Sequence, residues 1–195
     1  MTSRRSPTAP EDTPALVRAA LRESLRIGYL DSTRSETGRL LATLAATRSG
    51  VIADLGTGCG VGAAWLRSGA PAGTRVVTVE RDTTLAASAG TLFAGQGVEV
   101  IDGDWSTIDW RAYGVDGFSL ISLDLTTARG ARGRLVDLLA PGGLLVLDDL
   151  HSSWPFAGPE PVDSIVLHAW LREERLICTE VRAAPDASLL LAARR

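Results

Sequence analysis

The chain has 195 residues, of which 45% are apolar and 22% charged, and its formal net charge is −3. At roughly 100–200 residues per domain, this length predicts one folded domain, and the apolar content excludes a mostly disordered chain. The basic residues form no stripe and no apolar run approaches the ~20 residues of a membrane span, so we expect neither a nucleic-acid partner nor a membrane segment.

Several residue types that many enzymes depend on are scarce or absent. The two cysteines, Cys59 and Cys178, make no disulfide framework, which predicts a cytoplasmic protein. All 20 basic residues are arginine, so a pyridoxal Schiff base, a phosphate-binding Walker lysine and a lysine general base are excluded. With only two histidines, His151 and His168, a multi-histidine zinc site is excluded as well.

The N-terminal part of the chain is expected to precede the core of the domain. Residues 1–12 are rich in Ser, Thr, Pro and charge, which predicts a disordered tail. Residues 13–195 are expected to form the single domain, beginning with helices over 13–50. Asp12 or Thr13 can cap the first helix.

From residue 51 to 195, short apolar runs alternate with helical patterns. Strands are predicted over 51–55, 75–80, 98–101, 118–123 and 144–147, and helices over 61–67, 84–93, 128–139 and 162–172. Two final strands, 176–181 and 188–193, are separated by so short a turn that they must be antiparallel. This pattern predicts an α/β fold: a Rossmann-like, doubly wound sheet of seven strands, mostly parallel, with five β-α units and an antiparallel C-terminal hairpin.

A glycine-rich loop follows the first predicted strand and opens a helix. Its sequence is Asp54-Leu55-Gly56-Thr57-Gly58-Cys59-Gly60. Glycines at this point allow the backbone to turn tightly and to approach a ligand. The next strand ends in Glu80, where a carboxylate can accept hydrogen bonds from both hydroxyls of a ribose.

Two classes of cofactor, dinucleotides and S-adenosylmethionine (SAM), are compatible with this loop, and the dinucleotides fit less well. Gly58 to Ala63 matches the dinucleotide pattern G-x-G-x-x-A. Asp54 would repel the pyrophosphate of a dinucleotide, however, whereas it suits the cationic sulfonium and amino groups of SAM. A third interpretation is that the glycines only permit tight packing of the strand and the helix.

Over nearly all of residues 13–195 the chain resembles the class I SAM-dependent methyltransferases. The glycine loop matches the first motif of that family, Val-Thr-Val-Glu80-Arg81-Asp82 the second, and Gly103-Asp104-Trp105 the segment that usually holds the adenine. The resemblance implies methyl transfer with release of S-adenosylhomocysteine (SAH), and implies that Tyr29, Ser35 and Glu36 close over the cofactor. The cofactor-binding residues that it implies are Asp54, Gly56, Thr57, Gly58, Gly60, Glu80, Arg81, Asp104, Trp105 and Asp124.

Within this class the chain is most similar to the small, metal-dependent O-methyltransferases of the catechol and caffeoyl-CoA type. That similarity implies a divalent cation, such as Mg²⁺, held by Asp124 after one strand and by Asp148 and Asp149 after the next, with Asp149 where the family has asparagine. The family's acceptor-side lysine is missing, since Thr127 stands in its place. The similarity also implies that the acceptor is a small-molecule hydroxyl, with metal assistance left open.

Asp124 and His151 are the candidate catalytic residues, and His151 is the titratable base nearest to the acidic pair in the sequence. Two alternatives stay open: a SAM-binding protein with a cyclising or ligand-binding role, and an NAD-dependent oxidoreductase. The expected partner is a small-molecule acceptor, and a homodimer is left open.

Overall fold

The computed structural model describes residues 12–150, 162–184 and 187–195. The predicted disordered tail therefore lies outside the described residues, apart from Asp12. In the described part of the chain, no helix has both the length and the apolar character needed to cross a membrane.

The centre of the molecule is a seven-stranded sheet with the order β3-β2-β1-β4-β5-β7-β6. The neighbours from β3 to β5 pair in parallel, whereas β7 pairs antiparallel with both β5 and β6. The predicted fold and the C-terminal hairpin are confirmed. The strands are β1 (Val51–Leu55), β2 (Arg75–Glu80), β3 (Val98–Asp102), β4 (Phe118–Asp124), β5 (Leu139–Leu150), β6 (Leu176–Ala184) and β7 (Ala187–Arg194).

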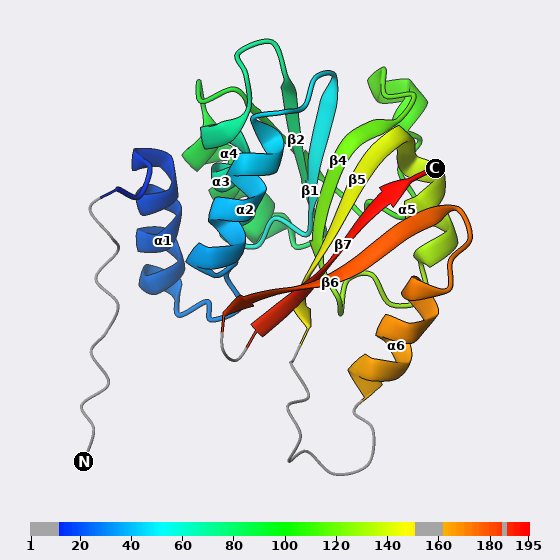
Figure 1. Cartoon of the computed structure of the whole chain (residues 1–195). Coiled ribbons are helices and arrows are strands. Elements are labelled where there is room, and N and C mark those ends of the chain that lie inside the picture. The colour runs from blue at the N-terminus through cyan, green and yellow to red at the C-terminus, as the bar shows by residue number, and fades with distance from the viewer. Residues whose placement is uncertain (1–11, 151–161, 185–186) are drawn as a thin grey trace, which may run out of the picture.

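Helices cover both faces of the sheet (Figure 1). Four helices pack on one face, and the other two pack on the opposite face with a short 3-10 helix, so that each face has its own apolar core. The first four are α1 (Ala15–Ile27), α2 (Ser35–Ala45), α3 (Val61–Gly69) and α4 (Thr83–Phe93), and those opposite are α5 (Arg132–Leu138), α6 (Val162–Leu171) and η1 (Trp110–Tyr113).

Some predicted boundaries and caps are wrong. Pro14 occupies the N-cap of α1 and makes no side-chain cap, while Asp12 pairs with Arg39 of α2 instead. The connection from β3 to β4 contains only η1, so one of the five expected β-α units has no α-helix. Helix α5 begins four residues later than predicted, at Arg132, because residues 125–130 form turns.

Asp82 caps α4, and its loss is expected to weaken the fold. Its Oδ1 atom accepts hydrogen bonds from the backbone N–H groups of Thr84 at 2.8 Å and Leu85 at 3.1 Å. Asp82→Ala should lower the free energy of unfolding by about 1 kcal/mol in a urea titration. Asp82→Asn keeps an acceptor oxygen and should retain most of the stability; an equal loss in both variants would contradict the capping role.

Candidate functional site

The carboxyl ends of the central strands bring several polar side chains to one edge of the sheet. In the ladder between β1 and β4, Asp54 is in register with Ser122, and between β4 and β5, Asp124 is in register with Asp148. Ligands of open α/β sheets bind at this edge, where the strand order reverses. Here the order reverses between β1 and β4, so the residues following these two strands face a common space.

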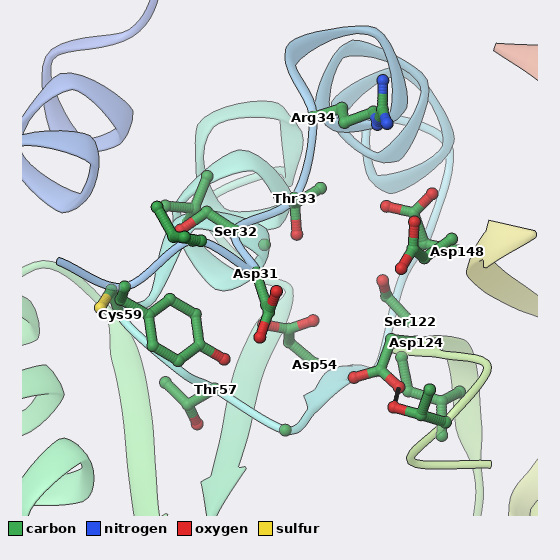
Figure 2. Close-up of a pocket in the computed structure, with 18 residues that line it drawn as sticks. Asp31, Ser32, Thr33, Arg34, Asp54, Thr57, Cys59, Ser122, Asp124 and Asp148 are labelled. Atoms are coloured by element: carbon green, nitrogen blue, oxygen red, sulfur yellow. Dashed lines mark hydrogen bonds between the residues drawn. The ribbon is translucent and has the colours of Figure 1, made fainter. Parts of the chain in front are cut away.

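A cavity of about 740 Å³ opens at this edge. It is lined by the ends of β1, β4 and β5, by the glycine loop and by the segment between α1 and α2. Figure 2 shows the carboxyl groups of Asp31 and Asp54 beside each other, with Asp124 and Asp148 on the other side of the space. The carboxyl groups of these four acids therefore surround the cavity.

Asp54 is the most buried of these acids, at 5% exposure. Its carboxyl group lies against the first turn of α3, where a Cβ atom on Gly62 would come within 2.8 Å of both carboxyl oxygens. Burial raises the pKa of Asp54 to about 8, and repulsion from Asp124 and Asp148 adds to this effect. The group therefore favours a cation that would stabilise its charged form.

Hydrogen bonds between β1 and β2 hold the glycine loop in place. The backbone N–H groups of Gly56 and Thr57 donate to the carbonyl oxygen of Val79 at 2.9 and 3.0 Å. The hydroxyl groups of Thr57 and Thr78 lie 2.7 Å apart and are buried. The Thr57 side chain thus anchors the loop to β2, even though the residue also lines the cavity.

Glu80 ties the glycine loop to the turn that follows β2. Its Oε2 atom accepts a hydrogen bond from the N–H of Gly58 at 2.8 Å, and its Oε1 atom accepts one from the N–H of Asp82 at 2.9 Å. Each oxygen of a carboxylate can accept a further hydrogen bond. Glu80 is thus fixed in orientation and still has acceptor capacity toward a ligand.

A second cavity, of about 510 Å³, lies beside the first. Its lining includes six of the predicted cofactor residues, which are Gly56, Glu80, Arg81, Asp104, Trp105 and Asp124. The carboxyl group of Asp104 accepts hydrogen bonds from the N–H and the hydroxyl of Ser106, and these bonds lower the pKa of Asp104. Four residues line both cavities, so the two adjoin: Tyr29, Gly56, Asp124 and Thr126.

Tyr29 covers the glycine loop from the segment between α1 and α2. A Cβ atom on Gly58 would lie 2.7 Å from the Tyr29 hydroxyl oxygen, and Gly58 has a φ of 51°, so a larger residue is disfavoured on both counts. Burial, reinforced by the charge of Glu80, raises the pKa of Tyr29 to about 12. Ser35 and Glu36, which were expected to close over a cofactor with it, lie in the first turn of α2 and line neither of the two cavities, so their role stays a prediction.

The three predicted metal ligands do not form a metal site in the described structure. Both oxygens of Asp124 accept hydrogen bonds within its own turn, from Thr126 and Thr127. Asp148 accepts a hydrogen bond from the buried Thr37 hydroxyl at 2.9 Å, and Asp149 is exposed with a φ of 61°. Within residues 12–150, 162–184 and 187–195, no group of three His, Cys, Asp or Glu side chains is placed to hold a metal ion. A cation held by these three acids therefore stays a prediction, and in this structure the oxygens of Asp124 and one oxygen of Asp148 accept hydrogen bonds from neighbouring threonines.

Other predicted residues lie elsewhere or outside the described structure. Gly60 lies against α4, where a Cβ atom would come within 2.8 Å of the Phe93 ring, so its glycine is explained by packing. His151, the predicted base, lies outside the described residues. Cys59 is buried and lines the first cavity, where burial raises the pKa of its thiol.

Sequence reasoning missed the contribution of residues 31–34. Asp31, Ser32, Thr33 and Arg34 all line the first cavity, and the positive charge of Arg34 acts on Asp148 to lower its pKa, against the dominant effect of burial. A signal was present in the sequence, because four consecutive polar residues separate two helices at this point. A polar link of this kind is also typical of an ordinary exposed loop.

Comparisons with known proteins give matches by structure. Neither a protein-family model nor a curated protein matches the sequence. The fold matches an O-methyltransferase from Bacillus cereus, solved with SAH, at 18% identity and a TM-score of 0.73, covering 96% of this chain and 94% of the other. It also matches an O-methyltransferase of tomaymycin synthesis from Streptomyces achromogenes, solved with SAM, at 20% identity and a TM-score of 0.72, with 93% and 90% covered. A methyltransferase from Geobacter sulfurreducens is 22% identical with a TM-score of 0.72, and 94% and 89% are covered.

Proposed function

We propose that this chain, which has the fold of the class I SAM-dependent methyltransferases, binds SAM and methylates a hydroxyl group of a small molecule. The observation that carries the proposal is the pair of adjoining cavities at the carboxyl edge of the sheet, one lined by Asp54 and the other by Glu80. Fold alone does not determine activity, so the chemistry of these residues has to support it.

The residues at this edge fit the chemical groups of SAM. The buried carboxyl of Asp54 suits a cationic neighbour, and the acceptor capacity of Glu80 suits the two hydroxyls of a ribose. Asp104 and Trp105 line the second cavity together with Glu80, which suits an adenine beside the ribose. No phosphate-binding lysine exists in the chain, and the acids beside the glycine loop oppose a pyrophosphate, so a dinucleotide is disfavoured.

The contribution of the protein to catalysis would be mainly positioning. SAM, if bound, would supply its methyl group to the acceptor oxygen, with the sulfur keeping the electron pair of the broken carbon–sulfur bond, and the hydroxyl proton would have to pass to a base. The fixed loop and the rigid strand ends orient the reacting groups, and such orientation can contribute several kcal/mol to lowering a barrier. Asp124 and His151 stay predictions for the catalytic residues.

Ligand binding separates this proposal from the alternatives. In isothermal titration calorimetry, SAH should bind the purified chain and NAD should not. Incubation of radiolabelled SAM with pooled small hydroxyl compounds should then yield labelled product. Binding of NAD in preference to SAH would overturn the cofactor assignment, and SAH binding without transfer to any hydroxyl would favour a non-methylating role.

Glu80→Ala tests the assignment of the second cavity. We expect SAH affinity to fall by roughly 10- to 100-fold, because hydrogen bonds to a charged group contribute about 1.5–3 kcal/mol. The variant also leaves the N–H of Gly58 without its carboxylate partner. Glu99→Ala is the matched control, since Glu99 pairs with Arg75 at an exposed position on β3. Unchanged affinity in Glu80→Ala would refute the role of this residue.

A further inference from the structure

A buried hydroxyl group in the wall of the first cavity has no partner in the described structure. Ser122, two residues before the end of β4, is 4% exposed and lines this cavity. Its hydroxyl makes no hydrogen bond to any residue that the structure describes, whereas the buried hydroxyls of Thr37 and Thr57 are both engaged. Figure 2 shows Ser122 between Asp54 and Asp148, with its oxygen toward the open space. Because an unpaired buried polar group is costly, this hydroxyl is poised to pair with a ligand in the cavity.

The place of Ser122 in the sheet corresponds to the amino-acid end of SAM. The residues proposed for SAM follow the sheet order β3-β2-β1, with Asp104 after β3 for the adenine, Glu80 on β2 for the ribose and Asp54 on β1 for the cationic groups. Ser122 continues this row on β4, in register with Asp54. The groups of SAM have the same order, from adenine through ribose and sulfur to the amino acid. Ser122 therefore lies where the ammonium and carboxylate of that amino acid are expected.

The N-terminus of α2 borders the same cavity and favours a negative group. Its N-cap residue, Arg34, lines the cavity, and Thr37 in its first turn donates a hydrogen bond to Asp148. No side chain caps this helix, and no described residue accepts a hydrogen bond from the backbone N–H groups of residues 35–37. Such N–H groups carry partial positive charge and attract carboxylates. The cavity can therefore accept a carboxylate here, although acids line much of the rest of it.

We propose, resting on the proposed function, that the Ser122 hydroxyl donates a hydrogen bond to the α-carboxylate of SAM near the N-terminus of α2. The amino-acid end of SAM is a zwitterion, so its site needs an acid and a donor beside each other. Asp54 and Ser122, in register on neighbouring strands, supply one of each. Ser122 lies outside the sequence motifs shared with the methyltransferases, and it determines specificity for the carboxylate of the cofactor.

The test compares two nucleosides that differ in this carboxylate. Calorimetry measures SAH, which has the carboxylate and the ammonium, and S-adenosyl-3-thiopropylamine, which keeps the ammonium and lacks the carboxylate. Ser122→Ala should weaken SAH binding by roughly 10- to 100-fold, because a hydrogen bond to a charged group is lost. The same variant should bind the amine as tightly as the wild type does.

Ser119→Ala is the matched control on the same strand. It also removes a hydroxyl group from β4, but one that donates to the backbone carbonyl oxygens of Ser49 and Val51 and lines neither cavity. This variant should leave SAH affinity unchanged. The proposal is overturned if Ser122→Ala binds SAH as tightly as the wild type, or if it weakens both nucleosides by the same factor, as a purely structural role would. Absence of SAH binding in the wild type would instead refute the proposed function, and this inference with it.

Discussion

Replacing Gly69 by alanine is expected to lower the free energy of unfolding by about 3 kcal/mol. Gly69 ends α3 where this helix crosses α2. An added Cβ atom would lie 2.0 Å from the carbonyl oxygen of Ala42 and 2.6 Å from its carbonyl carbon. Backbone atoms cannot rotate aside as a side chain can, so the two helices would have to separate. Because α2 carries Thr37, which contacts Asp148, the first cavity should be disturbed as well.

A second helical glycine provides the control for this variant. Gly90 lies within α4, is exposed, and would have no atom within 4 Å of an added Cβ. Gly90→Ala should therefore raise the free energy of unfolding by about 0.5–1 kcal/mol, since glycine is the poorer helix former. Urea titrations of both variants measure the contrast. Similar stabilities would show that α2 and α3 adjust to the extra methyl group, and that their close contact does not require glycine at position 69.

Most of the sheet was predictable because its strands are short apolar runs with clear ends. Val51–Leu55 and Arg75–Glu80 form strands over the predicted residues, and the hairpin followed from the length of its turn. Helix caps were less predictable. Thr13 was a plausible cap by residue type, yet its side chain is buried without a hydrogen-bond partner in the described structure, and Pro14 occupies the N-cap. Neither candidate caps the helix, and Asp12 pairs with Arg39 of α2 instead.

In the candidate site, the positions of the residues were predictable but the orientations of their side chains were not. The positions of Asp54, Glu80, Asp124 and Asp148 at one edge of the sheet followed from strand ends, because parallel strands share that edge. The orientation of each side chain did not follow. The Thr126 and Thr127 hydroxyls draw the carboxyl of Asp124 into its own turn, a local competition that a comparison of motifs does not reveal.

The stability of the chain should also depend on pH through Asp54. Its pKa is about 8 in the fold, chiefly because of burial, against an ordinary value of 3.8 in the unfolded chain. Between these values the fold retains a proton that the unfolded chain has lost, so unfolding releases a proton and the free energy of unfolding falls as pH rises. The Asp54→Asn variant lacks this titration. We expect the stability of the wild type relative to Asp54→Asn to fall by several kcal/mol between about pH 4 and 8, at about 1.4 kcal/mol per pKa unit.

Glu23→Gln provides a control in which the stability changes with pH in the opposite direction. Hydrogen bonds from Arg26 and Ser88 lower the pKa of Glu23 to about 2, so its contribution is lost only as pH falls below its ordinary value of 4.5. Urea titrations at several pH values should therefore separate the two variants.

A saturating cationic ligand that pairs with Asp54 would favour the ionised carboxyl. The stability of the wild type would then fall less steeply with pH. The same titrations in the presence of SAH therefore test whether the ammonium group of the cofactor lies beside Asp54. Without ligand, the free energy of unfolding could instead change with pH equally in the wild type and in Asp54→Asn. That result would show that Asp54 is ionised in the fold, and would remove the electrostatic basis for its pairing with a cationic cofactor.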